Sequence, residues 1–580
     1  MSDNVSSNRA LSHRTEHHVI ERQRQERTLL IPIWLVWAAA LCFVLIGLGS
    51  EGILDNNEGL YAEISREMLA SHDWHRWIIP HLDGLPYMEK PPLLYWLTAI
   101  SFALFGESEW TARAVPALSS LACVAMLMWF GQSQRQPQVG RLAALMFITG
   151  AGTAAMSRVL MFDMLLTALL TAALMCAYRY LNEGNVRWLR WSYAFLALAL
   201  LTKGFVALVL FGLTMLGFAL INARSPLGFL RDCSKWFEPW AILIFCLITA
   251  PWHLTASLIE PTYAWLYFIN EHVLRFLGKR EPHDYYTGAW WYYLPRIAVA
   301  LFPWSFILPC LLASSDRNSA QNCARLRQFL WLAWLTPLFF FSISTAKANY
   351  YMVTAMPFAA FHLAIALKER DFLNPVLRAV PGILITLVGI ASCTALLFRA
   401  EDANPPLLIL GLAQHEFALL VSEGTALIGL TCAGFAWRYN RIGVLAYLGL
   451  SVWIFVASIA ALRAAEPLIS TRSLANYLQS ESASRTIYLY GYLEEQSSLP
   501  FYLKHPIPVI GTRSNDLFWG DKVRSGNNIV ISDNQFAQQM QNQPVAVVVT
   551  TRQLNDFKTA NYFKYFKREQ HIGKATVFFN

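Results

Sequence analysis

The chain has 580 residues, of which 55% are hydrophobic and only 14% are Asp, Glu, Lys or Arg. A soluble protein carries about a quarter of its residues as these charged types, so the composition excludes a soluble globular protein and indicates one that crosses a membrane repeatedly. The formal net charge of +8 does not indicate nucleic-acid binding, because the basic residues lie in short loops between apolar runs, where they orient membrane helices.

The N-terminal part combines a polar tail with an apolar run. Residues 1–28 are polar and basic, and Leu30–Leu48 is apolar without a small-residue cleavage site after it. We therefore expect a cytoplasmic tail and a retained membrane anchor rather than a signal peptide. The nine cysteines are scattered singly with no C-x-x-C spacing, which argues against a disulfide framework or a thiolate zinc site.

Basic loops and apolar runs alternate along residues 29–462. Short basic loops stay on the cytoplasmic side of a membrane, so the runs between them pair into hairpins whose tips point outward. The count is about thirteen membrane-spanning helices. The expected fold is an α-helical polytopic membrane domain with two long outer loops, 51–92 and 257–295.

The composition changes beyond Arg463. Charged and amide residues increase, and short β-branched or aromatic runs alternate with helical patterns; these runs are Thr486–Tyr490, Ile507–Ile510, Ile529–Ser532, Val545–Thr550 and Ala575–Phe579. Such alternation is typical of an α/β fold. We expect residues 463–580 to form a small α/β domain outside the membrane, on the periplasmic side.

The first outer loop contains an amphipathic pattern with acidic residues at its start. Leu60, Ile64 and Met68 recur at i, i+4 and i+8 after Asp55 and Glu58, which predicts a helix lying at the membrane surface. A plain interfacial anchor and the floor of a reaction centre explain this pattern equally well.

The end of the same loop places Glu89 and Lys90 directly before Pro91 and Pro92, a pair that suits the start of a helix. A carboxylate can ligate a divalent cation, and an ammonium can hold a phosphate. A mutual salt bridge or a snorkelling flank is the structural alternative.

Other charged residues lie inside or against apolar runs. Arg158 and Asp163 flank the start of one run, and Lys203 separates two apolar halves. Intramembrane charges are rare and need partners, so an internal ion pair and a ligand contact both stay open. The polar residues gather on the outer side, which favours a one-sided cavity over a transport pathway: Asp55, Glu58, Glu63, Arg66, Glu67, Glu89, Lys90, Arg158, Asp163, Lys203, Glu271, His272, Arg275 and Lys347.

Taken together, these segments resemble the bacterial branch of the protein O-mannosyltransferase-like GT-C superfamily, and within it the aminoarabinose transferases that modify lipid A. Each motif is weak alone, but the set is specific and occurs in order along nearly the whole chain: Tyr61–Ser71, Asp73-Trp74, Pro80-His81, Gly84-Leu85, Tyr87–Pro91, Arg158 with Asp163, Thr202–Gly204, Asn270–Phe276, Lys347–Tyr351, Gly491-Tyr492 and Leu499–Leu503.

The resemblance implies a GT-C fold, a sugar-phosphoryl-undecaprenol donor and inversion at the anomeric carbon. It also implies that Glu89 and His272 ligate a divalent metal, with zinc as the expected ion. Binding of the carrier phosphate is expected from Tyr87, Lys90, Arg158, Lys203, Arg275, Lys347, Tyr350 and Tyr351.

One position departs from the family pattern. Alignment on Tyr61-Ala62-Glu63 puts Asn57, where the family has its proposed catalytic Asp, directly before Glu58. Asn cannot take a proton as a carboxylate can, so Asp55 is expected to act as the base or to orient the acceptor. A phosphate acceptor is already anionic and would tolerate this change. The candidate catalytic residues are Asp55, Asn57, Glu58 and Asp163.

The sequence therefore predicts a monomeric glycosyltransferase of the bacterial inner membrane with a periplasmic active site. It would move a sugar from undecaprenyl phosphate to an envelope acceptor, lipid A being the expected one. Two alternatives stay open: a transferase for protein hydroxyls or another envelope glycan with the same donor, and a lipid or solute transporter.

Overall fold

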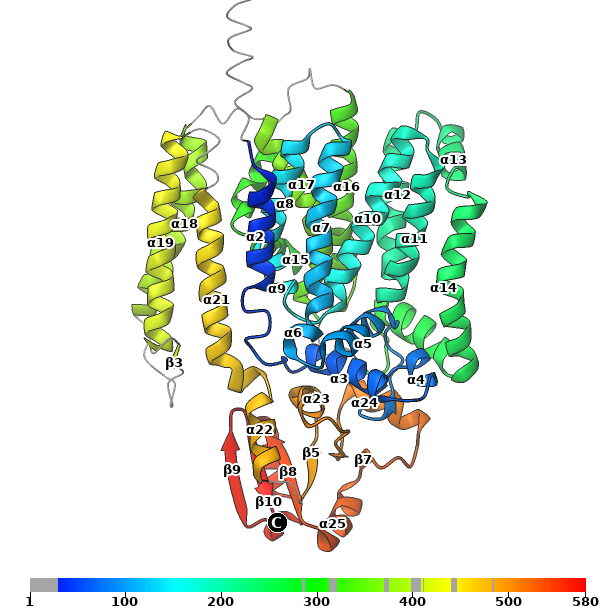
Figure 1. Ribbon diagram of the computed structural model, residues 1–580, viewed down its shortest axis with the longest axis vertical. Helices are drawn as coiled ribbons and strands as arrows, with labels where there is room; N and C mark the ends of the chain where they lie inside the picture. The colour runs from blue at the N-terminus through cyan, green and yellow to red at the C-terminus, as the bar shows by residue number, and fades with distance from the viewer. Residues whose placement is uncertain are drawn as a thin grey trace, which may run out of the picture.

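The computed structural model describes residues 30–283, 287–311, 321–369, 375–397, 408–409, 412–439, 446–481 and 485–580. The expected tail at 1–28 lies outside these residues. A bundle of helices forms one part of the molecule, and an α/β domain lies against one end of it (Figure 1).

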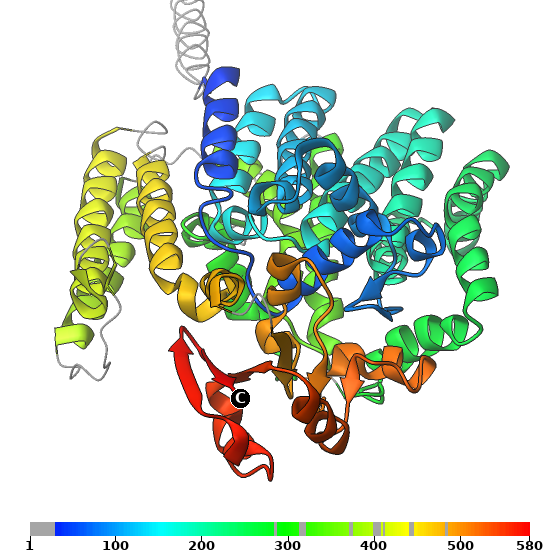
Figure 2. The ribbon, with the colours of Figure 1, turned by 60° about the horizontal axis from the view of Figure 1, so that its bottom comes forward.

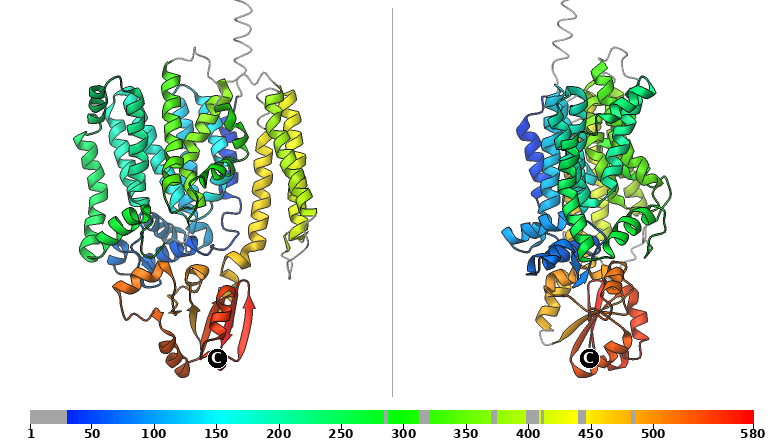
Figure 3. Two further views of the ribbon diagram at one scale, coloured as in Figure 1. Left: turned by 180° about the vertical axis from the view of Figure 1, so that it is seen from behind. Right: turned by 90° about the vertical axis from the view of Figure 1, so that its right-hand side faces the viewer.

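Within the described residues, eight helical segments are long and apolar enough to cross a membrane. They are α7 (Ala114–Ser133), α10 (Phe162–Glu183), α14 (Pro239–Ile259), α16 (Gln321–Ile343), η3 with α17 (Asn349–Ala355 and Met356–Glu369), α18 (Pro375–Leu397), α19 (Gln414–Arg438) and α21 (Tyr447–Ile469). Shorter helices run beside them in Figures 1 and 3: α2 (Ile33–Leu45), α8 (Pro137–Thr149), α11 (Val186–Lys203), α12 (Val206–Asn222) and α15 (Tyr293–Leu301). The α-helical polytopic architecture is confirmed, and the count of thirteen spans stays a prediction.

The helices differ in how much apolar surface they expose. α10 and the η3–α17 segment are mostly buried at the centre of the bundle, whereas α14, α18, α19 and α21 expose most of theirs. Such exposure suits helices that face lipid. α18 and α19 pack closely through small residues, and a Cβ on Gly382 would lie 2.6 Å from the backbone nitrogen of Ala433, as is common between membrane helices.

An outer layer separates the bundle from the α/β domain in Figures 1 and 2. It consists of α3 (Asn57–Ala70), α4 (His75–Ile78), the hairpin β1–β2 (His81–Leu82 and Leu85–Pro86), α5 (Leu93–Phe105) and α6 (Glu109–Ala112). The predicted helix at the membrane surface corresponds to α3, but α3 is buried on its polar face too, including Glu58, Glu63 and Glu67. The plain interfacial anchor is therefore wrong, because the α/β domain covers the face that the pattern left for solvent.

The α/β domain contains a six-stranded mixed sheet in the order β7-β6-β5-β8-β10-β9. Strands β5 (Thr486–Tyr490), β6 (Val509–Ile510), β7 (Val530–Ile531) and β8 (Val545–Thr550) are parallel, and β9 (Arg568–Ile572) and β10 (Ala575–Phe579) add an antiparallel hairpin. Helix α22 (Arg472–Glu481) precedes β5, and helices α23 (Leu499–Leu503), α24 (Asn515–Val523), α25 (Asp533–Asn542) and α26 (Leu554–Lys558) connect the strands. The edge strand β9 is mostly exposed and polar, which is why no alternating pattern marked it.

The bundle and the domain meet through buried polar contacts. α21 continues through Arg463 to Ile469, beyond the expected boundary at 462, because its last turns lie in this polar junction and not in an apolar run. The backbone amide of Ile507 donates to Asp83 Oδ1 at 2.7 Å. A Cβ on Gly520 of α24 would lie 2.9 Å from the Leu85 side chain, so α24 packs directly on the β1–β2 hairpin.

Candidate active site

A cavity of about 740 Å³ lies where α10, α11, α12, η3, the outer layer and α24 meet. One wall is apolar and includes Val206, Val209, Phe276, Leu277, Phe340 and Phe341. The charged lining residues are Glu89, Lys90, Asp163, Lys203, Glu271, His272, Arg275, Arg280, Lys347 and Asp516. The cavity thus offers an apolar surface beside a dense cluster of charges, as a lipid with an ionic head group requires.

Arg280 is the centre of the largest charge cluster. Its Nε lies 2.5 Å from Glu271 Oε1, and its Nη2 lies 2.7 Å from Glu89 Oε1. Arg275 Nη1 lies 3.1 Å from Glu271, and Lys90 Nζ lies 3.7 Å from both carboxylates. Among the described residues, three cationic groups thus gather around two carboxylates.

The two carboxyl groups of this cluster respond differently to burial. Burial raises the pKa of Glu271, but Arg280, Lys90 and Arg275 outweigh it and lower that pKa to about 2. For Glu89, burial and the neighbouring Glu271 charge raise the pKa to about 7, against the opposing effect of Arg280. Glu271 is therefore the permanent anion of the pair. Glu89 is therefore the carboxyl group of the pair that can take up a proton near neutral pH.

A second charge pair lies between two helices of the bundle. Lys203 at the end of α11 places Nζ 2.5 Å from Asp163 Oδ1 at the start of α10. The same Nζ lies 4.4 Å from the Tyr351 ring centre and 5.6 Å from that of Tyr350. The structure therefore brings these predicted residues together on the cavity wall. They form an ion pair there, and from the same position they can also contact a ligand.

The turn after Lys203 requires glycine. Gly204 has φ +75°, and a Cβ there would overlap the His272 ring. His272 Nδ1 contacts the carbonyl of Tyr267 at 2.6 Å, and its Nε2 accepts the backbone amide of Phe205 at 3.1 Å. Burial lowers the pKa of His272, so its ring is held neutral between two backbone groups.

The expected metal site finds little support in these contacts. Glu89 and His272 both line the cavity, but Glu89 is bonded to Arg280 and both His272 nitrogens are engaged. Across the residues that the structure describes, no group of three or more His, Cys, Asp or Glu side chains could hold a metal ion. The donor set does not fit a divalent cation, which needs several oxygen or nitrogen ligands, and the zinc ion stays a prediction.

Lys347 lines the cavity with its ammonium directed at backbone. Its Nζ donates to the carbonyls of Phe341 and Ser342 at 2.8 Å each. These carbonyls end α16, where the helix leaves acceptors without partners of its own. Lys347 therefore caps α16, and its ammonium would have to leave these carbonyls to bind a phosphate as predicted.

Asn57 lines another part of the cavity, next to Tyr61. The Tyr61 hydroxyl donates to Asn57 Oδ1 at 3.2 Å. The Tyr87 hydroxyl lies 3.4 Å from Glu89 Oε2 and 3.3 Å from Asp516 Oδ1, both long contacts. Burial raises the pKa of Asp516 to about 7. This end of the cavity therefore combines hydroxyl and amide groups with a carboxyl group from the α/β domain.

Asp55 and Glu58 do not reach the cavity, and the expectation for Asp55 is corrected here. Asp55 Oδ1 accepts the backbone amide and the hydroxyl of Ser498, and Oδ2 lies 2.6 Å from Lys574 Nζ. Glu58 is paired with Arg113 at 2.8 Å and also accepts backbone amides of Leu54 and Leu160. Both carboxylates are therefore engaged in contacts that hold the outer layer in place.

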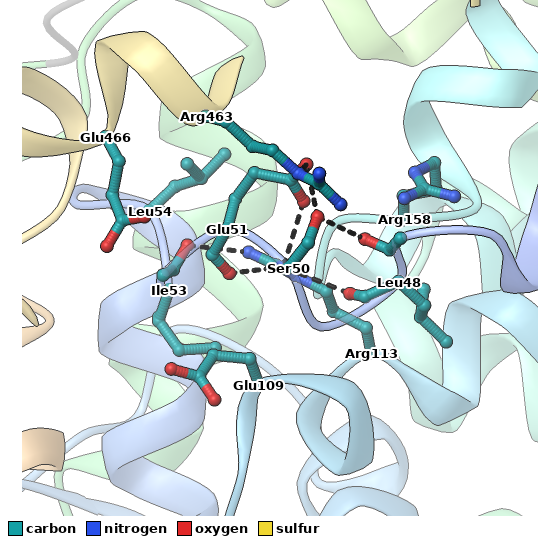
Figure 4. A network of polar contacts seen from close by, with 12 residues as sticks. Leu48, Ser50, Glu51, Ile53, Leu54, Glu109, Arg113, Arg158, Arg463 and Glu466 are labelled. Carbon is teal, nitrogen blue, oxygen red and sulfur yellow. Dashed lines mark hydrogen bonds and ion pairs between the residues drawn. The ribbon is translucent and has the colours of Figure 1, made fainter. Parts of the chain in front are cut away.

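Arg158 also lies outside the cavity, in the polar network of Figure 4. Its Nη1 contacts the carbonyls of Phe43 and Val44 at 3.4 and 3.3 Å, and its guanidinium lies 5.2 Å from the Phe455 ring centre. These partners belong to α2 and α21. Arg158 therefore joins two helices of the bundle and does not line the cavity that contains the other residues expected to bind the carrier phosphate.

All the other predicted site residues line the cavity: Asn57, Tyr87, Glu89, Lys90, Asp163, Lys203, His272, Arg275, Lys347, Tyr350 and Tyr351. The sequence analysis missed Tyr61, Arg280 and Asp516. Arg280 follows Lys279 in the second outer loop, and that basic pair was the available signal. Asp516 carried none, because an acidic residue early in a helix of an α/β domain is ordinary.

Comparison with known proteins finds relatives of this chain in both sequence and fold. The family description "Dolichyl-phosphate-mannose-protein mannosyltransferase" matches residues 89–254. The chain is 30% identical over 413 residues to the undecaprenyl phosphate-alpha-4-amino-4-deoxy-L-arabinose arabinosyl transferase of Aeromonas salmonicida, covering 68% of this chain and 71% of the relative. It is 31% identical over 432 residues to the protein of the same name from Pseudomonas aeruginosa, covering 72% and 73%.

The fold is similar to that of ArnT from Cupriavidus metallidurans, whose crystal structure was determined with bound undecaprenyl phosphate. The TM-score is 0.75 with 23% identity, and the match covers 94% of this chain and 97% of that chain. The apo structure of the same protein gives the same values. The similarity extends over both the helical bundle and the α/β domain, since so little of either chain lies outside it.

Proposed function

The chain belongs to the family of undecaprenyl phosphate-alpha-4-amino-4-deoxy-L-arabinose arabinosyl transferases, and we propose that it transfers an amino sugar from undecaprenyl phosphate to a phosphate group of lipid A. It is a multi-pass membrane glycosyltransferase with the GT-C fold. The family inferred from the sequence is thereby confirmed, and the transporter alternative is set aside.

The observation that carries the proposed donor is the position of the Arg280 cluster beside the apolar wall. Arg275, Arg280 and Lys90 bring three cationic groups together at this point. A polyprenyl phosphate has a long apolar chain ending in an anion, so its chain would lie along Phe340 and Phe276 with its phosphate at this cluster. The same groups would stabilise the charge that the carrier phosphate gains as it leaves.

The proposed step is one displacement. An oxygen of the acceptor phosphate forms a bond to the anomeric carbon, and the bond between that carbon and the carrier phosphate oxygen breaks. Undecaprenyl phosphate leaves with the electron pair, and the sugar carbon is inverted. An acceptor phosphate is already anionic, so this step needs no carboxylate at position 57. No part of it is assigned to a metal.

The location follows from the side of the bundle on which the cavity lies. The outer layer and the α/β domain lie at one end of the helices (Figure 3), opposite the ends where the basic loops occur in the sequence. With basic loops on the cytoplasmic side, the cavity faces the periplasm of a bacterial inner membrane. Action as a monomer stays a prediction.

The purified full-length protein in lipid nanodiscs, supplied with undecaprenyl phosphate carrying 4-amino-4-deoxy-L-arabinose and with lipid A, tests the proposal. We expect mass spectrometry to find lipid A heavier by one amino sugar, and no product when lipid A lacks its phosphates. Transfer to a Ser- or Thr-containing peptide instead would contradict the phosphate acceptor and support the protein O-glycosyltransferase alternative.

A further inference from the structure

The α/β domain contributes one carboxylate to the cavity, Asp516 near the start of α24. Its backbone amide donates to Glu494 Oε1 at 3.2 Å, and the Ser514 hydroxyl, which caps α24, donates to the same oxygen at 2.8 Å. The helix start is therefore fixed within the domain. From this position the Asp516 side chain lines the cavity together with Asn57 and Tyr87.

α24 is also fixed from the membrane side. Trp519 Nε1 donates to the carbonyl of Glu281 at 2.8 Å, and Asn515 Nδ2 donates to the carbonyl of His283 at 2.9 Å. Both carbonyls follow Arg280 in the second outer loop. Because α24 is held by the domain on one side and by this loop on the other, Asp516 has a set position relative to the phosphate-binding cluster.

Asp516 differs from the other carboxylates of the cavity in its charge partners. Asp163 is paired with Lys203, Glu89 with Arg280, and Glu271 with both arginines of the cluster. Over the described part of the chain, Asp516 makes no ion pair within 4.0 Å, and its side chain contacts the Tyr87 hydroxyl and the Glu494 carboxyl. Among the described lining carboxylates it is thus the one with no cation in contact, and Arg280 and Lys90 act on it only from further away.

We propose that Asp516 recognises the ammonium group of a cationic amino sugar on the donor, and so determines the specificity of transfer. This inference rests on the proposed function. A cation that enters a partly buried cavity loses hydration and needs an anion there. The charge cluster around Arg280 would repel an ammonium and hold the phosphate. The ammonium would therefore lie against Asp516, which the Tyr87 hydroxyl separates from Glu89 of the cluster, with Asn57 as a further polar partner.

Two other roles for Asp516 fit less well. A general base is not needed when the acceptor is an anionic phosphate, because the attacking oxygen carries no proton to remove. A purely structural residue would use its carboxylate in the domain interface, as Asp55 does with Lys574 and Ser498, whereas Asp516 faces the cavity. The appended domain is therefore a specificity element of the enzyme in addition to a cover for the outer layer.

The test compares two donors of nearly equal size on the full-length enzyme in nanodiscs with lipid A. One is undecaprenyl phosphate with 4-amino-4-deoxy-L-arabinose, and the other is the same carrier with L-arabinose, whose neutral hydroxyl replaces the ammonium. We expect the wild type to prefer the amine donor by at least tenfold in kcat/KM. Asp516→Asn should remove most of that preference through a loss on the amine donor, and Asp516→Glu, which keeps the charge, should retain part of it.

Asp521→Asn is the matched control, because Asp521 lies on the same helix, contacts Asn527 and does not line the cavity; it should keep the wild-type preference. A wild type without preference overturns the inference whatever the variants do. If Asp516→Asn lowers kcat/KM equally for both donors, or changes neither value, the inference is also overturned. Transfer by the wild type would in that case still support the proposed function. A wild type that transfers neither donor removes the proposed function and the inference together.

Discussion

Lys574 Nζ lies 2.6 Å from Asp55 Oδ2, and this ion pair joins the start of the outer layer to the last β-hairpin of the chain. The Asp55 side chain is 2% exposed and that of Lys574 is 26% exposed. An acidic residue that the sequence suggested for chemistry thus serves the junction between two parts of the molecule.

We expect Asp55→Asn to weaken that junction without affecting catalysis. Loss of a buried charge partner should lower the free energy of unfolding by about 1–3 kcal/mol, because Lys574 is then left partly desolvated. Thermal unfolding in detergent checks this, and kcat/KM should stay within about threefold of the wild type. Lys574→Met should have a similar effect, and the double variant should lose less than the sum of the two. A hundredfold loss of kcat at unchanged stability would return Asp55 to the mechanism.

Arg280→Gln should abolish most of the activity. Without the guanidinium, Glu89 and Glu271 face each other with less compensation, and the carrier phosphate loses a binding group. We expect kcat/KM for the donor to fall by about 100-fold or more. Arg280→Lys should recover only part of it, since an ammonium lacks the planar fork with which Arg280 binds Glu271 through Nε and Glu89 through Nη2. Arg513→Gln, which breaks an exposed pair with Asp556, is the control that should remain active.

The Lys203–Asp163 pair can be separated into its structural and its catalytic role. Lys203→Met leaves a buried carboxylate without its partner and should destabilise the bundle by about 3 kcal/mol. Adding Asp163→Asn removes that carboxylate, so the double variant should regain much of the lost stability. Melting temperatures and donor kcat/KM measured together decide the question. If the double variant also regains activity, the pair is structural only.

Asp83 should make stability depend on pH. Burial raises the pKa of its carboxyl well above 3.8, so the folded protein binds this proton more tightly than the unfolded chain. Stability therefore falls as pH rises from about 4 through the folded pKa. Asp83→Asn keeps an acceptor for the Ile507 amide and carries no charge, and Asn tolerates the φ of 52° at this position.

We expect Asp83→Asn to be more stable than the wild type by about 1–2 kcal/mol near pH 8, with a smaller difference near pH 5. Melting temperatures of both proteins across this range measure the effect. A wild type that is the more stable protein at pH 8 would show that the Asp83 carboxylate is stabilised by the junction when ionised.

Much of the cavity could be predicted because charges beside apolar runs are costly. Lys203 and Asp163 can be tolerated at the ends of membrane helices only with a partner or a polar cavity, so their presence already indicated where the site lies. Glu89 and Lys90 lie directly before the Pro-Pro start of a helix, and these charged residues likewise indicated the position of the site. The helical bundle followed from apolar runs of membrane length.

The choice between Asp55 and Asn57 could not be read from spacing. Asn56 has φ 66°, and this left-handed residue turns the chain directly before α3. As a result Asp55 points to Ser498 of the α/β domain while Asn57 lines the cavity. Asp516 was beyond prediction for another reason, since a carboxylate in a water-exposed domain carries no penalty that would mark it.

The docking of α24 has a consequence for how the enzyme is made. Asn57 and Asp516 lie near opposite ends of the chain, and both belong to one cavity wall. A ribosome releases the membrane helices long before the residues of α24, so a nascent or truncated chain can insert in the bilayer and still have an open, unfinished cavity. Until the last domain is complete, the cavity would thus lack Asn515 and Asp516 of its lining.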